Sequence, residues 1–237
     1  MRVGHQTRIG RNRRVNQDRF FVDQQAGLFI VADGMGGHNA GEIAGSIAVS
    51  EISRAVREGL GTADDASVLL QESVLRAHNA IFENSVKFPS RRDMGTTVAV
   101  VLVQDDQVWV CHVGDSRVYL IGRGEIQPLT RDHTFVAEWL QEGRITPQQA
   151  RTHDARHGLT MALGVDDDIR PEVTHVSWHE GQCLLLCSDG LTEMLEDSTI
   201  LEIVKRAGEP DFICKELLDQ ALLRGGDDDI TVVLVCR

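Results

Sequence analysis

A strand that ends in a carboxylate is the feature that most limits how this chain can fold. Residues 28–32 are apolar and largely β-branched or aromatic, a pattern typical of a strand buried on both faces. The run ends directly in Asp33, and three glycines follow within four residues, beginning with Gly34. An anion at the end of a buried strand is costly unless it has a partner. We therefore expect Asp33 to hold a ligand, which a backbone without Cβ atoms can approach closely.

The same pattern, an aspartate at one end of an apolar run, recurs elsewhere in the chain. The further examples are Asp18, Asp115, Asp189 and the three aspartates at 227–229. If these strands share one core, their ends bring four or five carboxylates together, and such a cluster repels itself unless divalent cations neutralise it. Ligands that are all oxygen suit Mg2+ or Mn2+ better than Zn2+. The sequence therefore predicts a site for hard divalent cations.

Length and charge limit the class of protein. A chain of 237 residues can bury one sizeable core, and we expect residues 1–237 to form a single domain. No run approaches the roughly 18 apolar residues that cross a bilayer, and the basic N-terminus lacks the apolar stretch of a secretory signal. We expect a cytoplasmic protein without a membrane partner. The net charge of -12 opposes docking on nucleic-acid phosphates or anionic lipid.

The cysteines predict free thiols. Their number is odd and most lie within apolar runs: Cys111, Cys183, Cys187, Cys214 and Cys236. Small buried thiols in a reducing compartment fit this distribution better than disulfides.

The order of expected elements indicates an α+β or layered α/β class. Apolar residues at helical spacing predict four main helices, at 41–58, 66–84, 197–206 and 211–223. Apolar runs separated by tight turns predict antiparallel strands in the middle of the chain, at 98–103, 108–113 and 118–121. The segment 132–163 is the least regular, and we expect it to form a flap-like insert over the site.

Six motifs make the chain resemble the metal-dependent PP2C-type (PPM) serine/threonine phosphatases along its whole length, in particular the compact bacterial members. In chain order they are RRVNQD at 13–18, VADGMGGH at 31–38, MGTT at 94–97, HVGDSR at 112–117, CSDGL at 187–191 and GGDDDIT at 225–231. The resemblance implies a four-layer α-β-β-α sandwich, in which two antiparallel sheets pack face to face with helices outside. It also implies two Mn2+ or Mg2+ ions at one edge of the sandwich.

The resemblance assigns metal-binding roles to individual residues. Asp33 would bridge both ions, and the carbonyl of Gly34 would help to hold one of them. Asp189 and Asp228 would bind the other ion, and Asp18 would act through metal-bound water.

Three further roles complete the implied site. A third, weakly bound cation would be held by Asp115 together with Asp189. Arg13 supplies positive charge, because its guanidinium can hold two phosphate oxygens and reduce the repulsion that a dianion meets at a carboxylate cluster. His38 can protonate the departing serine or threonine oxygen, since histidine donates near neutral pH. A role for His38 in stabilising the glycine loop is an equal alternative.

Two positions depart from the family motifs. The final motif usually reads Gly-Gly-x-Asp-Asn, whereas this chain has Asp228 followed by Asp229, so either carboxylate is a candidate ligand. We choose Asp228 because it aligns with the aspartate of the motif. Asp154 stands where relatives commonly carry proline, which affects the flap and substrate preference rather than the chemistry. Two histidines without an assigned role, His112 and His133, are expected to be hydrogen-bonded structural residues.

Three functions are weighed against each other. The leading hypothesis is metal-dependent hydrolysis of phosphoserine and phosphothreonine on proteins by a monomeric enzyme that opposes a cognate serine/threonine kinase in bacterial signalling. A regulatory binding module that kept the fold but lost catalysis conflicts with the complete set of candidate ligands. A two-metal nuclease conflicts with the net charge of -12 and with the lack of a basic groove with interleaved aromatic residues.

Overall fold

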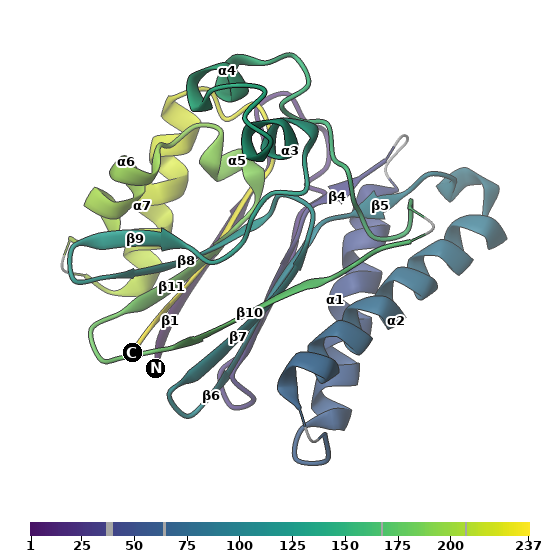
Figure 1. Ribbon diagram of the computed structural model, residues 1–237, viewed down its shortest axis with the longest axis horizontal. Coiled ribbons are helices and arrows are strands. Elements are labelled where there is room, and N and C mark those ends of the chain that lie inside the picture. Colours follow the sequence, from purple (N-terminus) through teal and green to yellow (C-terminus); the bar gives the residue numbers. More distant parts are fainter. Residues whose placement is uncertain (37–39, 64, 167, 207) are drawn as a thin grey trace.

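The computed structural model describes residues 1–36, 40–63, 65–166, 168–206 and 208–237. Two antiparallel sheets of five strands each pack face to face, and helices cover their outer faces (Figure 1). The structure therefore confirms the four-layer sandwich that the motifs implied.

Each sheet combines strands from distant parts of the chain. The first sheet joins the two termini and has the order β1 (Arg2–Arg8), β12 (Ile230–Cys236), β11 (Cys183–Cys187), β8 (Arg117–Gly122) and β9 (Glu125–Pro128). The second sheet has the order β10 (Glu172–Ser177), β7 (Gln107–Val113), β6 (Val98–Gln104), β3 (Leu28–Ala32) and β2 (Arg19–Asp23). A separate two-stranded ladder consists of β4 (Gly34–Met35) and β5 (Gly95–Thr96).

The helices form the outer layers. The second sheet is covered by α1 (Gly41–Gly59) and α2 (Ala66–Lys87), with the short 3-10 helix η1 (Pro89–Arg91) after them. The first sheet is covered by α5 (Asp189–Thr192), α6 (Asp197–Val204) and α7 (Pro210–Leu223). Within the described ranges, none of the helices combines the length and hydrophobicity that a membrane crossing needs.

Strand β3 shows why the apolar runs of this chain are continuous. Leu28 and Ile30 pack against the helices α1 and α2, whereas Phe29 and Val31 point into the core between the sheets. All five residues of β3 are buried. Because one sheet face meets helices and the other meets the second sheet, both sets of side chains are apolar. The predicted strand buried on both faces is confirmed.

Local signals placed the helix ends well, and short elements were missed. Asp65 accepts a hydrogen bond from the Ser67 N–H at 2.8 Å and so caps α2 directly before its first residue. Strand β9 and helix α5 were not predicted, because β9 is a short, mostly exposed edge strand and α5 has only four residues.

The prediction of free thiols is wrong for two of the five cysteines. Cys183 and Cys236 form a disulfide. They are direct partners in the antiparallel pairing of β11 with β12, with Cα atoms 4.1 Å apart, and the register of two strands separated by 53 residues cannot be read from the sequence. The other three cysteines are buried free thiols, as expected.

The segment 132–163, called the flap below, carries α3 (Phe135–Gln141) and α4 (Pro147–Thr152). Figure 1 shows both helices at the end of the molecule where α5 and the β4–β5 ladder also lie. The two ends of the flap are joined, because the Phe135 N–H donates to the Gly158 carbonyl at 3.0 Å and residues 134 and 159 form an isolated bridge.

Candidate metal centre

The backbone of Asp33 is fixed by the strand segment beside it. Its N–H donates to Thr97 Oγ1 at 3.2 Å. Its carbonyl accepts from the Thr97 N–H and from the Thr96 hydroxyl, both at 2.9 Å. These three bonds use all of the backbone polar groups of Asp33, so its side chain projects from a rigid position. They also explain why a threonine pair follows Gly95 in the MGTT motif.

Carboxyl groups from four other segments of the chain lie near Asp33. Burial holds the pKa of Asp33 well above its usual value, and the charges of Asp18, Asp189, Asp115 and Asp228 raise it further. Burial also raises the pKa of Asp189, and the charge of Asp228 raises it further. The predicted convergence of carboxylates from strand ends is therefore present in the structure. Acids this close together can all ionise near neutral pH only if cations lie among them.

Asp18 is the most enclosed member of the cluster, with 3% of its surface exposed. Ser188 Oγ donates to Asp18 Oδ2 at 2.7 Å, and the Thr231 N–H donates to Ser188 Oγ at 2.9 Å. Burial raises the pKa of Asp18 to about 7, although hydrogen bonds from Thr231 and Ser188 act in the opposite direction. The second oxygen, Oδ1, is buried and has no hydrogen-bond partner within the described part of the chain. This oxygen is available to another group.

The neighbouring residues Asp228 and Asp229 have different partners. Asp229 is buried, and its two oxygens accept the backbone N–H groups of Gly10 at 2.9 Å and Gln17 at 2.7 Å. Asp228 pairs with the Arg13 guanidinium and is the charge that most raises the pKa of the cluster's Asp189 after burial. Asp229 thus holds the N-terminal loop in place, whereas Asp228 is directed to the cluster.

Arg13 lies beside the cluster, where the sequence analysis put it. Its side chain is 42% exposed and pairs with Asp228. The position is open to an incoming ligand, and a guanidinium there can share its donors between the carboxylate and phosphate oxygens.

The glycine loop after Asp33 is described only in part. A Cβ atom on Gly34 would lie 2.2 Å from the carbonyl oxygen of Gly41, so only glycine fits between Asp33 and the start of α1. His38 lies outside the described residues, and its role stays a prediction.

Asp115 occupies the flap side of the cluster. Burial holds its pKa well above the usual value, and among nearby charges Asp189 contributes most. Asp115 and Asp189 both line a groove of about 660 Å3, which lies between the flap and the segment from α5 to Ser198. The two acids therefore face the same space beneath the flap.

Two residues that the sequence analysis did not assign extend this side of the site. The ligand atoms of His157, Asp189 and Glu193 lie within 4.8 Å of one another, and His157 Nδ1 pairs with Glu193. Burial and the charge of Asp189 raise the pKa of Glu193 to about 7. Glu193 follows Asp189 by four residues across a helical turn, a spacing that places both on one face and was the available signal. His157 arrives from the flap, which no local pattern indicates.

The groups present fit hard divalent cations. The donors are almost all carboxylate oxygens, and two of them, Asp18 Oδ1 and Asp189 Oδ1, are buried without a hydrogen-bond partner among the described residues. Divalent ions would replace the mutual repulsion of the carboxylates with attraction and would occupy these two oxygens. This donor chemistry suits Mg2+ or Mn2+.

Comparisons with known proteins agree with the fold. Residues 6–214 match the family model described as protein phosphatase 2C. The chain is 36% identical over 243 residues to the serine/threonine phosphatase Stp of Listeria monocytogenes serotype 4b (strain F2365), covering 100% of this chain and 96% of the relative. The crystal structure of the serine/threonine phosphatase Stp1 of Staphylococcus aureus is similar with a TM-score of 0.92 at 31% identity, covering 100% and 95% of the two chains.

A third similar protein was solved with metal. The catalytic domain of the serine/threonine phosphatase PstP, in complex with two manganese ions, has a TM-score of 0.88 at 34% identity, with 98% of this chain and 96% of that chain covered.

A helix-covered double sheet with a carboxylate cluster is typical of one class of metal-dependent hydrolases. The sequence similarity over the full chain identifies the family within that class. This chain belongs to the protein phosphatase 2C family and is a serine/threonine phosphatase.

Proposed function

We propose that the chain hydrolyses phosphoserine and phosphothreonine on proteins with water activated at two divalent cations, Mn2+ or Mg2+. The observation that carries this proposal is the surroundings of Asp33, whose backbone is held by three hydrogen bonds and whose pKa is raised by the charges of four other acids as well as by burial. The two manganese ions of the similar PstP domain support the choice of metal and number.

The resemblance to the family implies which residues would hold the two ions. Asp33 would contact both ions, the carbonyl of Gly34 would help to hold one, and Asp189 and Asp228 would hold the other. When bound, such ions lower the pKa of water and stabilise charge on a phosphoryl group. Asp18 Oδ1, held in place through Ser188, would orient the attacking water.

Arg13 and His38 would contact the substrate. The exposed Arg13 guanidinium would hold two oxygens of the phosphoryl group, which places the phosphorus in line with the water. His38 would donate a proton to the departing serine or threonine oxygen. A third, weaker cation would be held by Asp115 with Asp189 in the groove beneath the flap.

The biological setting is also a proposal. We propose that the enzyme acts as a monomer in the cytoplasm on phosphorylated proteins and opposes a cognate serine/threonine kinase. A comparison of the phosphoproteome with and without the gene would identify the substrates, and their kinase would be found among enzymes that phosphorylate the same sites.

The test is phosphate release from a phosphothreonine peptide in the presence of Mn2+, with a nucleic-acid substrate measured in parallel. We expect release from the peptide alone and complete loss in EDTA. Asp105→Asn, in the exposed turn between β6 and β7, is a matched control that should retain full activity. Full turnover by metal-stripped protein in EDTA would rule out the two-metal proposal, and cleavage of the nucleic acid would favour the nuclease.

A further inference from the structure

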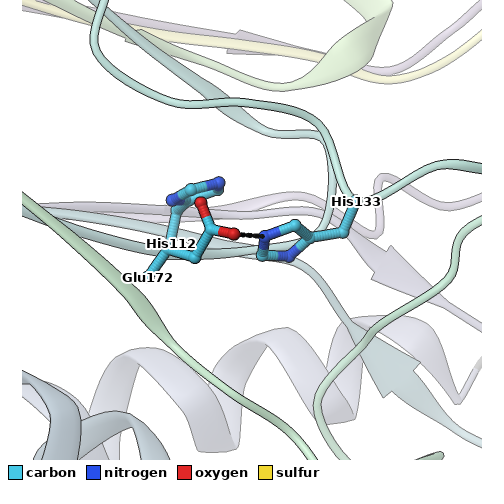
Figure 2. Close-up of side chains that lie close together, drawn as sticks. All are labelled: His112, His133 and Glu172. Atoms are coloured by element: carbon cyan, nitrogen blue, oxygen red, sulfur yellow. Dashed lines mark ion pairs between the residues drawn. The ribbon is translucent and has the colours of Figure 1, made fainter. Parts of the chain in front are cut away.

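A second group of potential metal ligands lies outside the carboxylate cluster. His112 near the end of β7, His133 in the flap and Glu172 at the start of β10 have ligand atoms within 4.8 Å of one another. The two imidazoles stack with centroids 4.6 Å apart, and both histidines are buried. Figure 2 shows the carboxylate of Glu172 directed toward the ring of His133. Two histidines and a carboxylate match a zinc site in composition.

The hydrogen bonds of these groups argue against a metal. His133 Nδ1 accepts the Gly114 N–H at 3.1 Å, and a neutral imidazole that accepts at Nδ1 carries its proton on Nε2. Nε2 is buried, lies 3.5 Å from Glu172 Oε1 and makes no hydrogen bond within the described part of the chain. Burial lowers the pKa of His133, and the neighbouring His112 lowers it further, so the neutral ring is the relevant form near pH 7. A protonated Nε2 has no lone pair for a cation.

The other two members of the group are also committed to protein partners. His112 Nε2 lies 2.8 Å from the carbonyl oxygen of Arg131, which can only accept, so this nitrogen carries the proton. The Arg131 guanidinium lies 3.0 Å from Glu172 Oε1. A cation at this carboxylate would have to displace a guanidinium. The group therefore holds His133 in one orientation and one tautomer.

His133 connects three segments through its backbone as well as its ring. Its N–H donates to the Gly114 carbonyl at 3.0 Å, and its own carbonyl accepts from the Thr160 N–H at 2.8 Å. Both backbone polar groups of Gly114 are thus bound by one residue of the flap. Gly114 has φ +99, and a Cβ atom there would lie 2.6 Å from Thr97, so this turn has no alternative residue. Asp115 is the next residue.

We propose that His133 is a positioning residue for the phosphatase reaction, which ties both ends of the flap to the strand end that presents Asp115. Its imidazole fixes the Gly114 peptide, and with it the direction of the Asp115 side chain. The same residue holds the start of the flap and, through Thr160, its return. The part that concerns cation binding rests on the proposed role of Asp115, whereas the part that concerns the flap does not.

The test compares two amides of different reach. In His133→Asn the side-chain oxygen can take the place of Nδ1 and accept the Gly114 N–H. In His133→Gln the amide reaches the place of Nε2 and leaves that N–H without its acceptor. His175→Gln is the control, because His175 is exposed and its ring stacks on Trp109, away from His133.

The first measurement is amide hydrogen exchange in metal-free protein, which does not depend on activity. We expect His133→Gln to speed exchange in peptides covering 112–116 and 132–163 by about tenfold, because an unpaired buried N–H is costly. His133→Asn and the control should differ from the parent by less than about threefold. Equal protection in all three variants would overturn the proposal, and so would equal loss in the Asn and Gln variants.

The second measurement is Mn2+ binding and phosphopeptide kinetics. In His133→Gln we expect the weakest Mn2+ site to lose about tenfold in affinity and kcat to fall, while the two tight sites and the KM of a small phosphate ester are unchanged. Weaker binding at the third site with normal binding at the two tight sites would support the inference. If the proposed function were wrong, the parent protein itself would lack Mn2+-dependent phosphatase activity, so the two failures are distinguishable. Zn2+ bound tightly by the metal-free parent and released in His133→Asn would show that the group is a metal site and would overturn the positioning role.

If His133→Gln does not unfold cooperatively on heating, Glu172→Gln is used in its place. It leaves the Gly114 bond intact but removes the negative charge 3.5 Å from Nε2, and we expect a smaller rise in flap exchange of about threefold. Unchanged exchange in that variant would also contradict the proposal.

Discussion

Asp33 and Asp115 both follow apolar strands, but they are held in different ways. The backbone of Asp33 is bound on both sides by Thr96 and Thr97, which belong to the sheet system itself. The backbone next to Asp115 is bound by His133, a residue of the flap. Thr97 connects the two regions, because its hydroxyl also contacts the hydroxyl of Ser116 at 2.7 Å.

The difference separates a rigid part of the site from an adjustable part. Rearranging Asp33 requires breaking strand pairing within a packed sandwich. Asp33 is therefore rigid, as an anchor for a metal pair with fixed spacing must be. Rearranging Asp115 requires only that the flap shift at its base. We infer that the reaction centre is set by the sheets and that access and the third cation are set by the flap. The predictions below test this division.

The largest effect is expected at Asp33. Asp33→Asn removes the charge that the two proposed ions would share while keeping the side-chain shape, and loss of metal stabilisation of several kcal/mol corresponds to about a thousandfold or more in kcat/KM. Mn2+ titration calorimetry should show that both tight sites are lost together. Retention of one tight site with partial activity would show that Asp33 does not bridge the ions.

A large effect on stability is expected from pH in metal-free protein. Burial and mutual repulsion raise the pKa values of Asp18, Asp33, Asp115 and Asp189 in the folded state, to about 7 for Asp18. The folded chain then binds protons that the unfolded chain releases. The stability that these carboxyl groups contribute is therefore fully present below about pH 4 and is lost as the pH rises through about 7. For Asp18 alone this amounts to roughly 4 kcal/mol at most.

The measurement is urea unfolding in EDTA at pH 5 and pH 8. We expect higher stability at pH 5, and Asp18→Asn should reduce the difference between the two values. Saturating Mn2+ should reverse the trend, because the ions require ionised carboxylates. Greater stability at pH 8 in EDTA would contradict the repulsion on which the metal assignment rests.

The next effect contrasts Asp229 with Asp228. Asp229→Ala leaves the N–H groups of Gly10 and Gln17 without acceptors, which should cost about 2 to 5 kcal/mol of unfolding free energy in protein without metal. Asp228→Ala removes one charge from a repelling cluster and a partly exposed ion pair, so metal-free stability should change by less than about 1 kcal/mol. Mn2+ affinity should fall in Asp228→Ala. The opposite pattern would make Asp229 the ligand.

This pair of aspartates shows where the sequence stops being informative. The strand-end pattern predicted that Asp18, Asp33, Asp115, Asp189 and one of the aspartates at 227–229 would meet, because apolar runs define strands and strands of one sandwich share their ends. It could not separate Asp228 from Asp229, since both follow the same glycines and the choice depends on Gly10 and Gln17 more than 200 residues away.

Two other contacts could not be predicted from the sequence, because they also join residues far apart in the chain. The disulfide between Cys183 and Cys236 depends on strand register, and the binding of Gly114 by His133 depends on the path of the flap. Helix and strand positions were predicted from local periodicity, whereas these contacts are set by tertiary packing. His133 was expected to be a hydrogen-bonded structural residue, which its bonds confirm, but its partners were not foreseen.

A moderate effect is expected at Arg13. Arg13→Ala should raise KM for a phosphopeptide by about tenfold to a hundredfold, since a charge-assisted contact to phosphate is lost. Affinity for the two tight Mn2+ ions should hold steady or rise, because Arg13 competes with them for Asp228. Arg14→Ala, next in sequence and without a predicted role, is the control. An unchanged KM with lower metal occupancy would show that Arg13 supports the metal ligands and does not contact substrate.

The smallest effect is expected at Asp115, on the adjustable side of the site. Asp115→Ala should leave the fold and the two tight ions intact, because Asp33 and its threonine partners are untouched. The weak third cation should be lost, and turnover of phosphopeptides should fall on the order of tenfold, since the loosest site gives up one of its few carboxylates. Calorimetry with Mn2+, followed by kinetics on the same samples, measures both quantities. The alternative is that Asp115 only caps its turn. Normal turnover in Asp115→Ala, together with a parent protein that binds two Mn2+ ions and no third, would leave that capping role alone and would place flap control of the site elsewhere than at this strand end.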